Sequence, residues 1–139
     1  MNDKASVTAP GWQYWTVAVL GFLWNCLGAY LYILTKLNDP LVTVGATPQM
    51  LDYIAHMQLW AHIGWSLGIW GSFAGSVLML LRSRFAVQAF LVSLLGALLS
   101  FAGQTQAGVL EPAEPIMILA VIGFLLWYCR RSEQAGLLR

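Results

Sequence analysis

Charged residues are scarce in this sequence. Only 9% of the 139 residues are Asp, Glu, Lys or Arg, whereas a soluble domain usually carries roughly 25%. So few charges cannot cover the surface of a water-soluble domain, and 59% of the residues are hydrophobic. The composition therefore indicates that lipid, rather than water, surrounds most of the chain.

Basic residues are also too few for nucleic-acid binding. The seven Lys and Arg residues leave a formal net charge of +1, and nucleic-acid binding needs a basic face that contacts many phosphates. We therefore expect membrane lipids as partners and no nucleic acid.

Four hydrophobic segments are long enough to cross a bilayer, which takes about 20 apolar residues. The predicted spans cover residues 12–35, 58–81, 85–103 and 112–129, the last starting where Pro112 is tolerated in a first turn. Only Arg82-Ser83-Arg84 separates the second span from the third, which predicts a tight antiparallel hairpin. The expected fold is all-α, an integral membrane four-helix bundle in a single domain, residues 1–139.

Basic residues gather on one side of the membrane under this placement. That side holds Lys4, Arg82, Arg84, Arg130, Arg131 and Arg139, and the other side holds Lys36. Because short cytoplasmic loops are enriched in Lys and Arg, both termini are predicted to be cytoplasmic in a bacterial inner (cytoplasmic) membrane. The outer side then holds Asp39, Asp52, Glu111 and Glu114. Aromatic residues expected in the inner interfacial belt are Trp12, Tyr14, Trp15, Trp127 and Tyr128.

Residues 38–57 form the main extramembrane segment. Thr47-Pro48 is typical of an N-cap followed by proline at the first helical position. The apolar side chains of Met50, Tyr53, Ile54 and Met57 then recur on one face. The segment should contain a short amphipathic helix at the outer surface.

Small residues recur every three or four positions along the first three spans, which predicts close helix packing in lipid. The predicted packing residues are Gly21, Asn25, Gly28, Gly64, Gly68, Gly71, Gly75, Ser93, Gly96, Ser100 and Gly103. The fourth span is bulkier, so we expect it at the periphery of the bundle. The alternative is that part of the small-residue face lines a narrow cavity.

No Asp, Glu, Lys or Arg falls within the predicted hydrocarbon depth of any span. Ion-coupled transporters mark their pathway with such a charge, so a proton-coupled mechanism like that of the small multidrug exporters is disfavoured. Asn25 is the strongly polar side chain nearest mid-membrane. It either hydrogen-bonds to another helix, with Ser66, Ser72, Ser93 or Ser100 as partner, or binds a polar solute.

Histidines and cysteines suggest no cofactor or metal. His56 and His62 share one helical stretch and cannot both ligate one haem, while Asp52 with His56 gives two ligands where Zn²⁺ takes about four. Cys26 lies near mid-membrane and Cys129 at the cytoplasmic end, which excludes a disulfide between them. We therefore expect no cofactor, no metal and no enzymatic activity.

Aromatic rings and amides cluster at the predicted outer mouth. The residues considered for contact with a solute are Asn25, Trp60, His62, Trp65 and Gln104. Such a set suits a small polar solute, and it equally suits an ordinary interfacial belt.

Several stretches resemble a family of small four-span proteobacterial inner-membrane proteins that are often labelled "sugar transporter" and have no established activity. They are Trp24-Asn25-Cys26-Leu27-Gly28-Ala29-Tyr30, Thr47-Pro48-Gln49 with Trp60, Trp65 and Trp70-Gly71, Leu80-Leu81-Arg82-Ser83-Arg84-Phe85-Ala86 and Leu126-Trp127-Tyr128-Cys129-Arg130-Arg131. The resemblance implies the four-span fold. Members of that family tend to carry an acidic residue where this chain has Leu31.

Two functions follow from these patterns. The first is an accessory or structural subunit that packs through its glycine-rich faces against a larger membrane complex. The alternative is a facilitator or transporter for a small, sugar-like solute that acts as a homo-oligomer, because four short spans enclose little volume alone.

Overall fold

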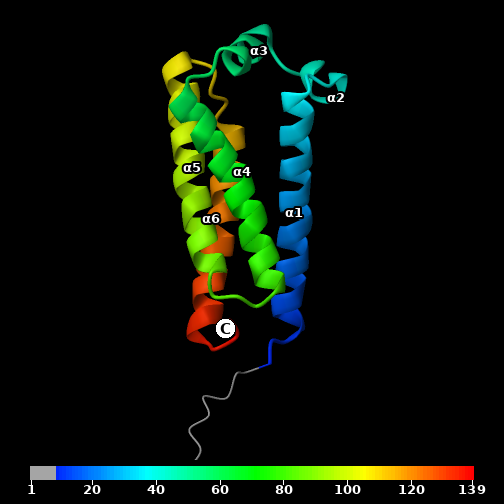
Figure 1. Cartoon of the computed structure of the whole chain (residues 1–139), viewed down its shortest axis with the longest axis vertical. Helices are drawn as coiled ribbons and strands as arrows, with labels where there is room; N and C mark the ends of the chain where they lie inside the picture. Colours follow the sequence, from blue (N-terminus) through cyan, green and yellow to red (C-terminus); the bar gives the residue numbers. More distant parts are fainter. Residues whose placement is uncertain (1–8) are drawn as a thin grey trace, which may run out of the picture.

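The computed structural model describes residues 9–139, and that part of the chain is helical without strands (Figure 1). Four long helices, α1 (Trp12–Lys36), α4 (Leu59–Leu80), α5 (Ala86–Ala107) and α6 (Ala113–Gln134), run along the bundle. All four are long and apolar enough to cross a membrane. The chain is thus a multi-pass membrane protein, and the predicted all-α four-helix bundle is confirmed.

Two short helices, α2 (Pro40–Thr43) and α3 (Pro48–Ala55), connect α1 to α4. The Thr47 hydroxyl accepts a hydrogen bond from the Met50 backbone N–H at 3.2 Å, so α3 begins with the cap that the sequence predicts. The sequence analysis did not predict α2, which also begins with an N-cap residue followed by proline. The Asp39 carboxylate accepts from the Leu41 N–H at 2.9 Å, and Pro40 follows it.

The ends of α5 and α6 lie beyond the predicted ends of the apolar runs. α5 continues to Ala107 rather than Gly103, and α6 continues to Gln134 rather than Cys129. Hydropathy marks where a helix leaves the hydrocarbon, whereas the helix itself ends where a residue adopts a left-handed conformation. Gly108 (φ 72°) and Gly136 (φ 75°) supply that conformation after the two helices.

α4 and α5 form the closest helix pair of the bundle. A Cβ placed on Gly96 would lie 2.6 Å from the Gly68 backbone N and 2.7 Å from the Gly64 carbonyl O. The Ser93 hydroxyl also donates a hydrogen bond to the Gly68 carbonyl at 2.6 Å. The glycines of α4 therefore pack against α5 within the same chain, as small residues do between membrane helices.

α1 and α6 join this pair mainly at the end that carries the described termini, which we call the inner end. A Cβ on Gly21 would lie 3.0 Å from Leu125 of α6. Tyr14 is 1% exposed, so it belongs to the core and not to the interfacial belt. Tyr14 can be buried because its phenol donates a hydrogen bond to the Met79 carbonyl of α4 at 2.6 Å.

The segment after α6 turns back and pairs with the loop between α4 and α5. The Arg84 N–H donates to the Arg139 carbonyl at 2.8 Å, and the Arg139 N–H donates to the Arg82 carbonyl at 2.7 Å. The Arg82 Nε donates to the Leu137 carbonyl at 3.0 Å, and Leu138 is buried. This pairing closes the inner end of the bundle.

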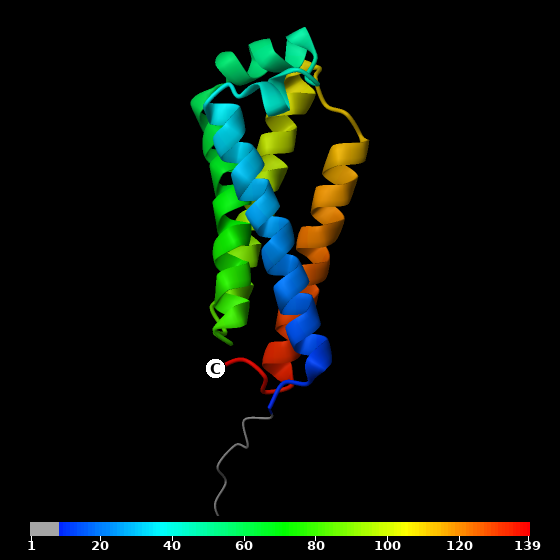
Figure 2. The same cartoon turned by 90° about the vertical axis from the view of Figure 1, so that its right-hand side faces the viewer.

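α2 and α3 cap the opposite end, which we call the outer end (Figures 1 and 2). Both ends of the described chain therefore face one side of the membrane. That this side is the cytoplasm is a prediction from the Lys/Arg bias, to which Lys4 contributes from outside the described residues.

Substituting Gly96 by alanine should destabilise the bundle by about 1–3 kcal/mol, because the new methyl group meets backbone atoms that cannot move aside. Gly123→Ala is the matched control, since a Cβ there meets nothing within 4 Å. Unfolding in a titration of SDS into mixed micelles measures both variants. Equal stability of the two would contradict the close α4–α5 contact.

Topology can be read from single cysteines. Gln49→Cys in α3 should react with a membrane-impermeant maleimide added to intact cells, whereas Glu133→Cys at the inner end should react only after lysis. Both positions are exposed. The unmodified chain is the control, because Cys129 is buried and Cys26 lies within α1. Labelling of Glu133→Cys in intact cells would reverse the predicted orientation.

Candidate ligand-binding cavity

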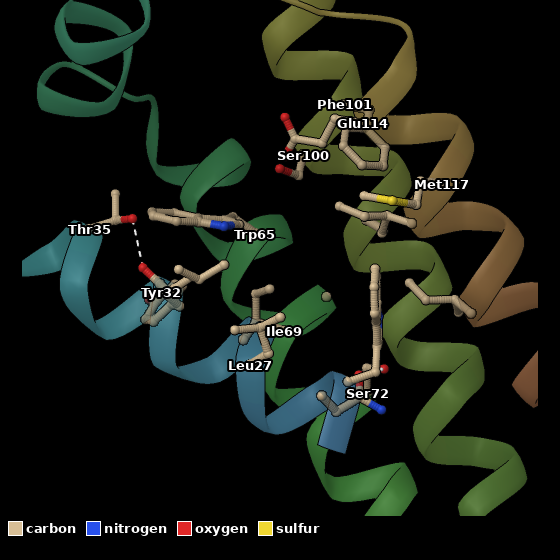
Figure 3. Close-up of a pocket in the computed structure, with 18 of the residues that line it drawn as sticks. Leu27, Tyr32, Thr35, Trp65, Ile69, Ser72, Ser100, Phe101, Glu114 and Met117 are labelled. Atoms are coloured by element: carbon tan, nitrogen blue, oxygen red, sulfur yellow. Dashed lines mark hydrogen bonds between the residues drawn. The ribbon is translucent and has the colours of Figure 1, made fainter. Parts of the chain in front are cut away.

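A cavity of about 450 Å³ lies among the four long helices (Figure 3). Cavities that hold small molecules measure roughly 300–1,000 Å³. Its walls are mainly apolar, with a few polar side chains at the two ends. The lining includes Leu27, Leu31, Tyr32 and Thr35 of α1, Trp65 and Ile69 of α4, Phe101 of α5, and Met117 and Ile122 of α6.

The cavity exists because α1 and α6 lie apart toward the outer end (Figure 2). A Cβ on Gly28 would meet only the end of the Ile69 side chain, at 3.9 Å, so Gly28 faces the cavity rather than a tightly packed helix. Leu31 of α1 and Met117 of α6 line the cavity and are also exposed. The cavity therefore opens between α1 and α6 toward lipid.

The inner floor of the cavity carries the Asn25 side chain, which is 6% exposed. Ser72, one of the four serines considered as partners, donates a hydrogen bond from its hydroxyl to Asn25 Oδ1 at 2.6 Å. Asn25 Nδ2 is buried and has no hydrogen-bond partner among the described residues. A buried N–H group without a partner is costly in a membrane interior, so a residue of the cavity floor carries an unused hydrogen-bond donor.

The outer end of the cavity presents acceptors instead. Figure 3 shows Ser100, Phe101 and Glu114 grouped there, across the cavity from Trp65 and Thr35. Gln104 also lines this end, and its Oε1 is buried without a partner. Oxygen atoms of an amide, a hydroxyl and a carboxylate thus converge on one end of an apolar chamber.

The structure adds a role for Glu114 that the sequence did not predict. The sequence placed Glu114 on the outer side, at the start of the span 112–129 and outside the hydrocarbon, whereas the structure shows that its place in the first turn of α6 is also on the cavity wall. An acidic residue suits the first turn because the helix dipole is positive there. The carboxylate therefore faces the chamber from one of the four long helices.

A second cavity of about 270 Å³ lies beneath α2 and α3. It shares part of its lining with the first, namely Thr35, Trp65, Ser100, Gln104 and Glu114. Tyr53 of α3 lines it and contacts α5, since a Cβ on Gly103 would lie 2.6 Å from the Tyr53 hydroxyl. Burial raises the pKa of Tyr53 because it disfavours the charged phenolate. The two cavities thus share one wall, and we call the first the chamber and the second, under the α2–α3 cap, the vestibule.

Lys36 is held at the outer wall by aromatic residues. Its ammonium contacts His62 Nε2 and lies 5.4 Å from the Trp65 ring centre and 5.8 Å from that of Tyr32. The Tyr32 hydroxyl in turn shares a 2.7 Å hydrogen bond with Ser66. Lys36 and His62 do not line either cavity.

The residues considered from sequence for solute contact thus divide into two groups. Asn25, Trp65 and Gln104 line the chamber, and Trp60 and His62 do not. Trp60 instead donates to the Gln58 side chain at 2.5 Å. Among the predicted packing residues, Gly28, Gly68 and Ser100 also line the chamber. Glu114 was missed, although a carboxylate just before an apolar run is a signal that could have found it.

The other polar groups of residues 9–139 form no metal site. Asp52 and His56 lie 3.2 Å apart and are both exposed. No three potential metal ligands come together in the described part of the chain, and Cys26 and Cys129 are both free.

No family model, curated protein or solved structure significantly matches this chain. The functional argument therefore rests on the geometry of its own residues.

The hydrogen bond between Asn25 and Ser72 can be measured with a double-mutant cycle. Ser72→Ala should cost about 1 kcal/mol, because it leaves both ends of the buried amide without a partner. In the Asn25→Leu background the same change should cost much less. Ser76→Ala is the matched control, because its hydroxyl bonds within α4 to the Phe73 carbonyl. Coupling to Asn25 as large for Ser76 as for Ser72 would contradict this assignment.

Proposed function

We propose that this chain is a non-enzymatic membrane protein that binds a small amphiphilic molecule and facilitates its exchange between lipid and the outer compartment. The observation that carries the proposal is the unpartnered Asn25 Nδ2 at the floor of the chamber. Nearly all buried polar groups have a hydrogen-bond partner, so an exception on a cavity wall calls for a ligand atom.

The lining favours an amphiphile over a sugar. Leu27, Leu31, Ile69, Met117 and Ile122 provide most of the side walls. A sugar would bring many hydroxyl groups against these side chains, and each hydroxyl left without a partner costs free energy. An apolar body with polar groups at its two ends matches the chamber better than the sugar-like solute considered from the sequence.

The positions of the two cavities support exchange rather than permanent storage. The chamber opens between α1 and α6 toward lipid, and the vestibule lies beneath α2 and α3. With both termini in the cytoplasm of a bacterium, α2 and α3 would face the periplasm. The occupant would then enter from the bilayer and leave by the vestibule, or the reverse.

The accessory-subunit role expected from the sequence stays a prediction, and the packing of α4 gives it less support. Its Gly64 and Gly68 lie against α5 of the same chain, so a partner protein would have to contact other surfaces. Exposed leucines such as Leu95 and Leu98 offer such a surface, as they do for lipid or a second copy.

Filling the chamber tests the proposal. Gly28→Phe should place a ring in the cavity and lower the affinity for 1-decanol by at least about tenfold, a loss of about 1.4 kcal/mol. Gly123→Phe is the matched control, because a Cβ there meets nothing within 4 Å. Isothermal titration calorimetry in phosphatidylcholine nanodiscs measures binding, with the signal of protein-free nanodiscs subtracted.

Two outcomes would oppose the proposal. Equal affinity of Gly28→Phe and Gly123→Phe would place the amphiphile elsewhere on the protein. A stoichiometric protein that co-purifies in mild detergent, together with no decanol binding, would support the accessory role instead.

A further inference from the structure

We infer that the occupant is a lipophilic amine, with its ammonium group at Glu114 and its apolar body extending toward Asn25. This inference rests on the proposed binding function and adds the chemical class of the ligand. It follows from the charge at the outer end of the chamber, from the acceptors that surround that charge, and from the donor at the floor.

Glu114 is the charged side chain that lines the chamber. Glu114 forms no ion pair with a basic side chain of residues 9–139. Lys36, the nearby cation of the outer end, is held by His62, Trp65 and Tyr32 outside the cavity lining. The wall of the chamber therefore carries an uncompensated carboxylate, which attracts a cation and repels an acid.

The groups beside Glu114 also suit an N–H donor. The Gln104 Oε1 is buried without a partner, and the Ser100 hydroxyl lies at the same end of the chamber (Figure 3). A primary ammonium carries three hydrogens and no acceptor, so it can donate to the carboxylate, the amide oxygen and the hydroxyl together. A neutral alcohol can donate only once.

The far end of the ligand is defined by Asn25. On α1 the lining runs from Trp24 to Thr35, which at about 1.5 Å per residue is roughly 16 Å of helix. Because the free group at the floor is the Asn25 N–H, the complementary ligand carries an oxygen acceptor at the end remote from its amine. A ten-carbon chain with an amine at one end and an oxygen at the other can reach both Glu114 and Asn25.

The head group is tested with decylamine, 1-decanol and decanoate on the whole chain in phosphatidylcholine nanodiscs. Decylamine should bind the unmodified protein at least about tenfold more tightly than 1-decanol, and decanoate should bind most weakly. Glu114→Gln should remove the preference for the amine, so that decylamine and 1-decanol bind this variant with affinities within about twofold of each other. Glu111→Gln is the matched control, because Glu111 is an exposed acid that lines neither cavity.

The remote acceptor is tested with 10-amino-1-decanol. It should bind the unmodified protein more tightly than decylamine does, and Asn25→Leu should abolish that difference. Thermal unfolding of each variant verifies that it remains folded, and the Asn25→Leu/Ser72→Ala pair replaces the first variant if it does not.

The outcomes separate this inference from the proposed function. If 1-decanol binding depends on Gly28 while Glu114→Gln and Glu111→Gln behave alike toward decylamine, the chamber binds an amphiphile and the amine class is wrong. If Glu114→Gln weakens decanol and decylamine equally, Glu114 has a structural role and the inference also fails. If no probe depends on Gly28, the proposed function fails first.

Discussion

The contact between the backbones of α4 and α5 is the constraint on which the rest of the structure depends. At Gly64 and Gly96 these helices approach so closely that even a methyl group would collide with backbone atoms, and at Gly68 it would lie 3.2 Å from the Ala97 backbone N. Lipid gives apolar helices no reason to associate, so such close packing has to hold the pair together. The small residues of α4 and α5 are used in this contact, whereas the bulkier α6 packs around it less completely and meets α1 at Gly21 and Leu125.

The incompletely packed region is also where buried polar atoms lack a hydrogen-bond partner. In the described part of the chain, three buried side-chain atoms lack a partner: Asn25 Nδ2, Tyr53 Oη and Gln104 Oε1. All three residues line the chamber or its vestibule. A protein shaped only for packing would have no reason to collect its unsatisfied groups around one space, which is why the geometry favours ligand binding over a purely structural role.

The elements that the sequence could predict were those governed by local chemistry. The lengths of the apolar runs placed the four long helices, and Thr47-Pro48 placed the start of α3. The features it missed depend on distant partners. Tyr14 is buried because a carbonyl of α4 accepts its hydrogen bond. Glu114 faces the chamber because α1 and α6 separate, and no pattern along either helix encodes that separation. Asn25 was recognisable as polar at mid-membrane, yet its free N–H emerged only with the Ser72 contact.

The pairing of residues 137–139 with the loop between α4 and α5 also bears on how the molecule is assembled. The Arg82 carbonyl and the Arg84 N–H pair with the backbone of Arg139, which the ribosome adds after α6 has been made. The hairpin of α4 and α5 can form early, whereas its inner loop must wait for the end of α6. Closure of the bundle at that side is consequently a late step that follows insertion. A nascent chain halted within α6 would already have the α4–α5 hairpin but not the hydrogen bonds between its loop and Arg139.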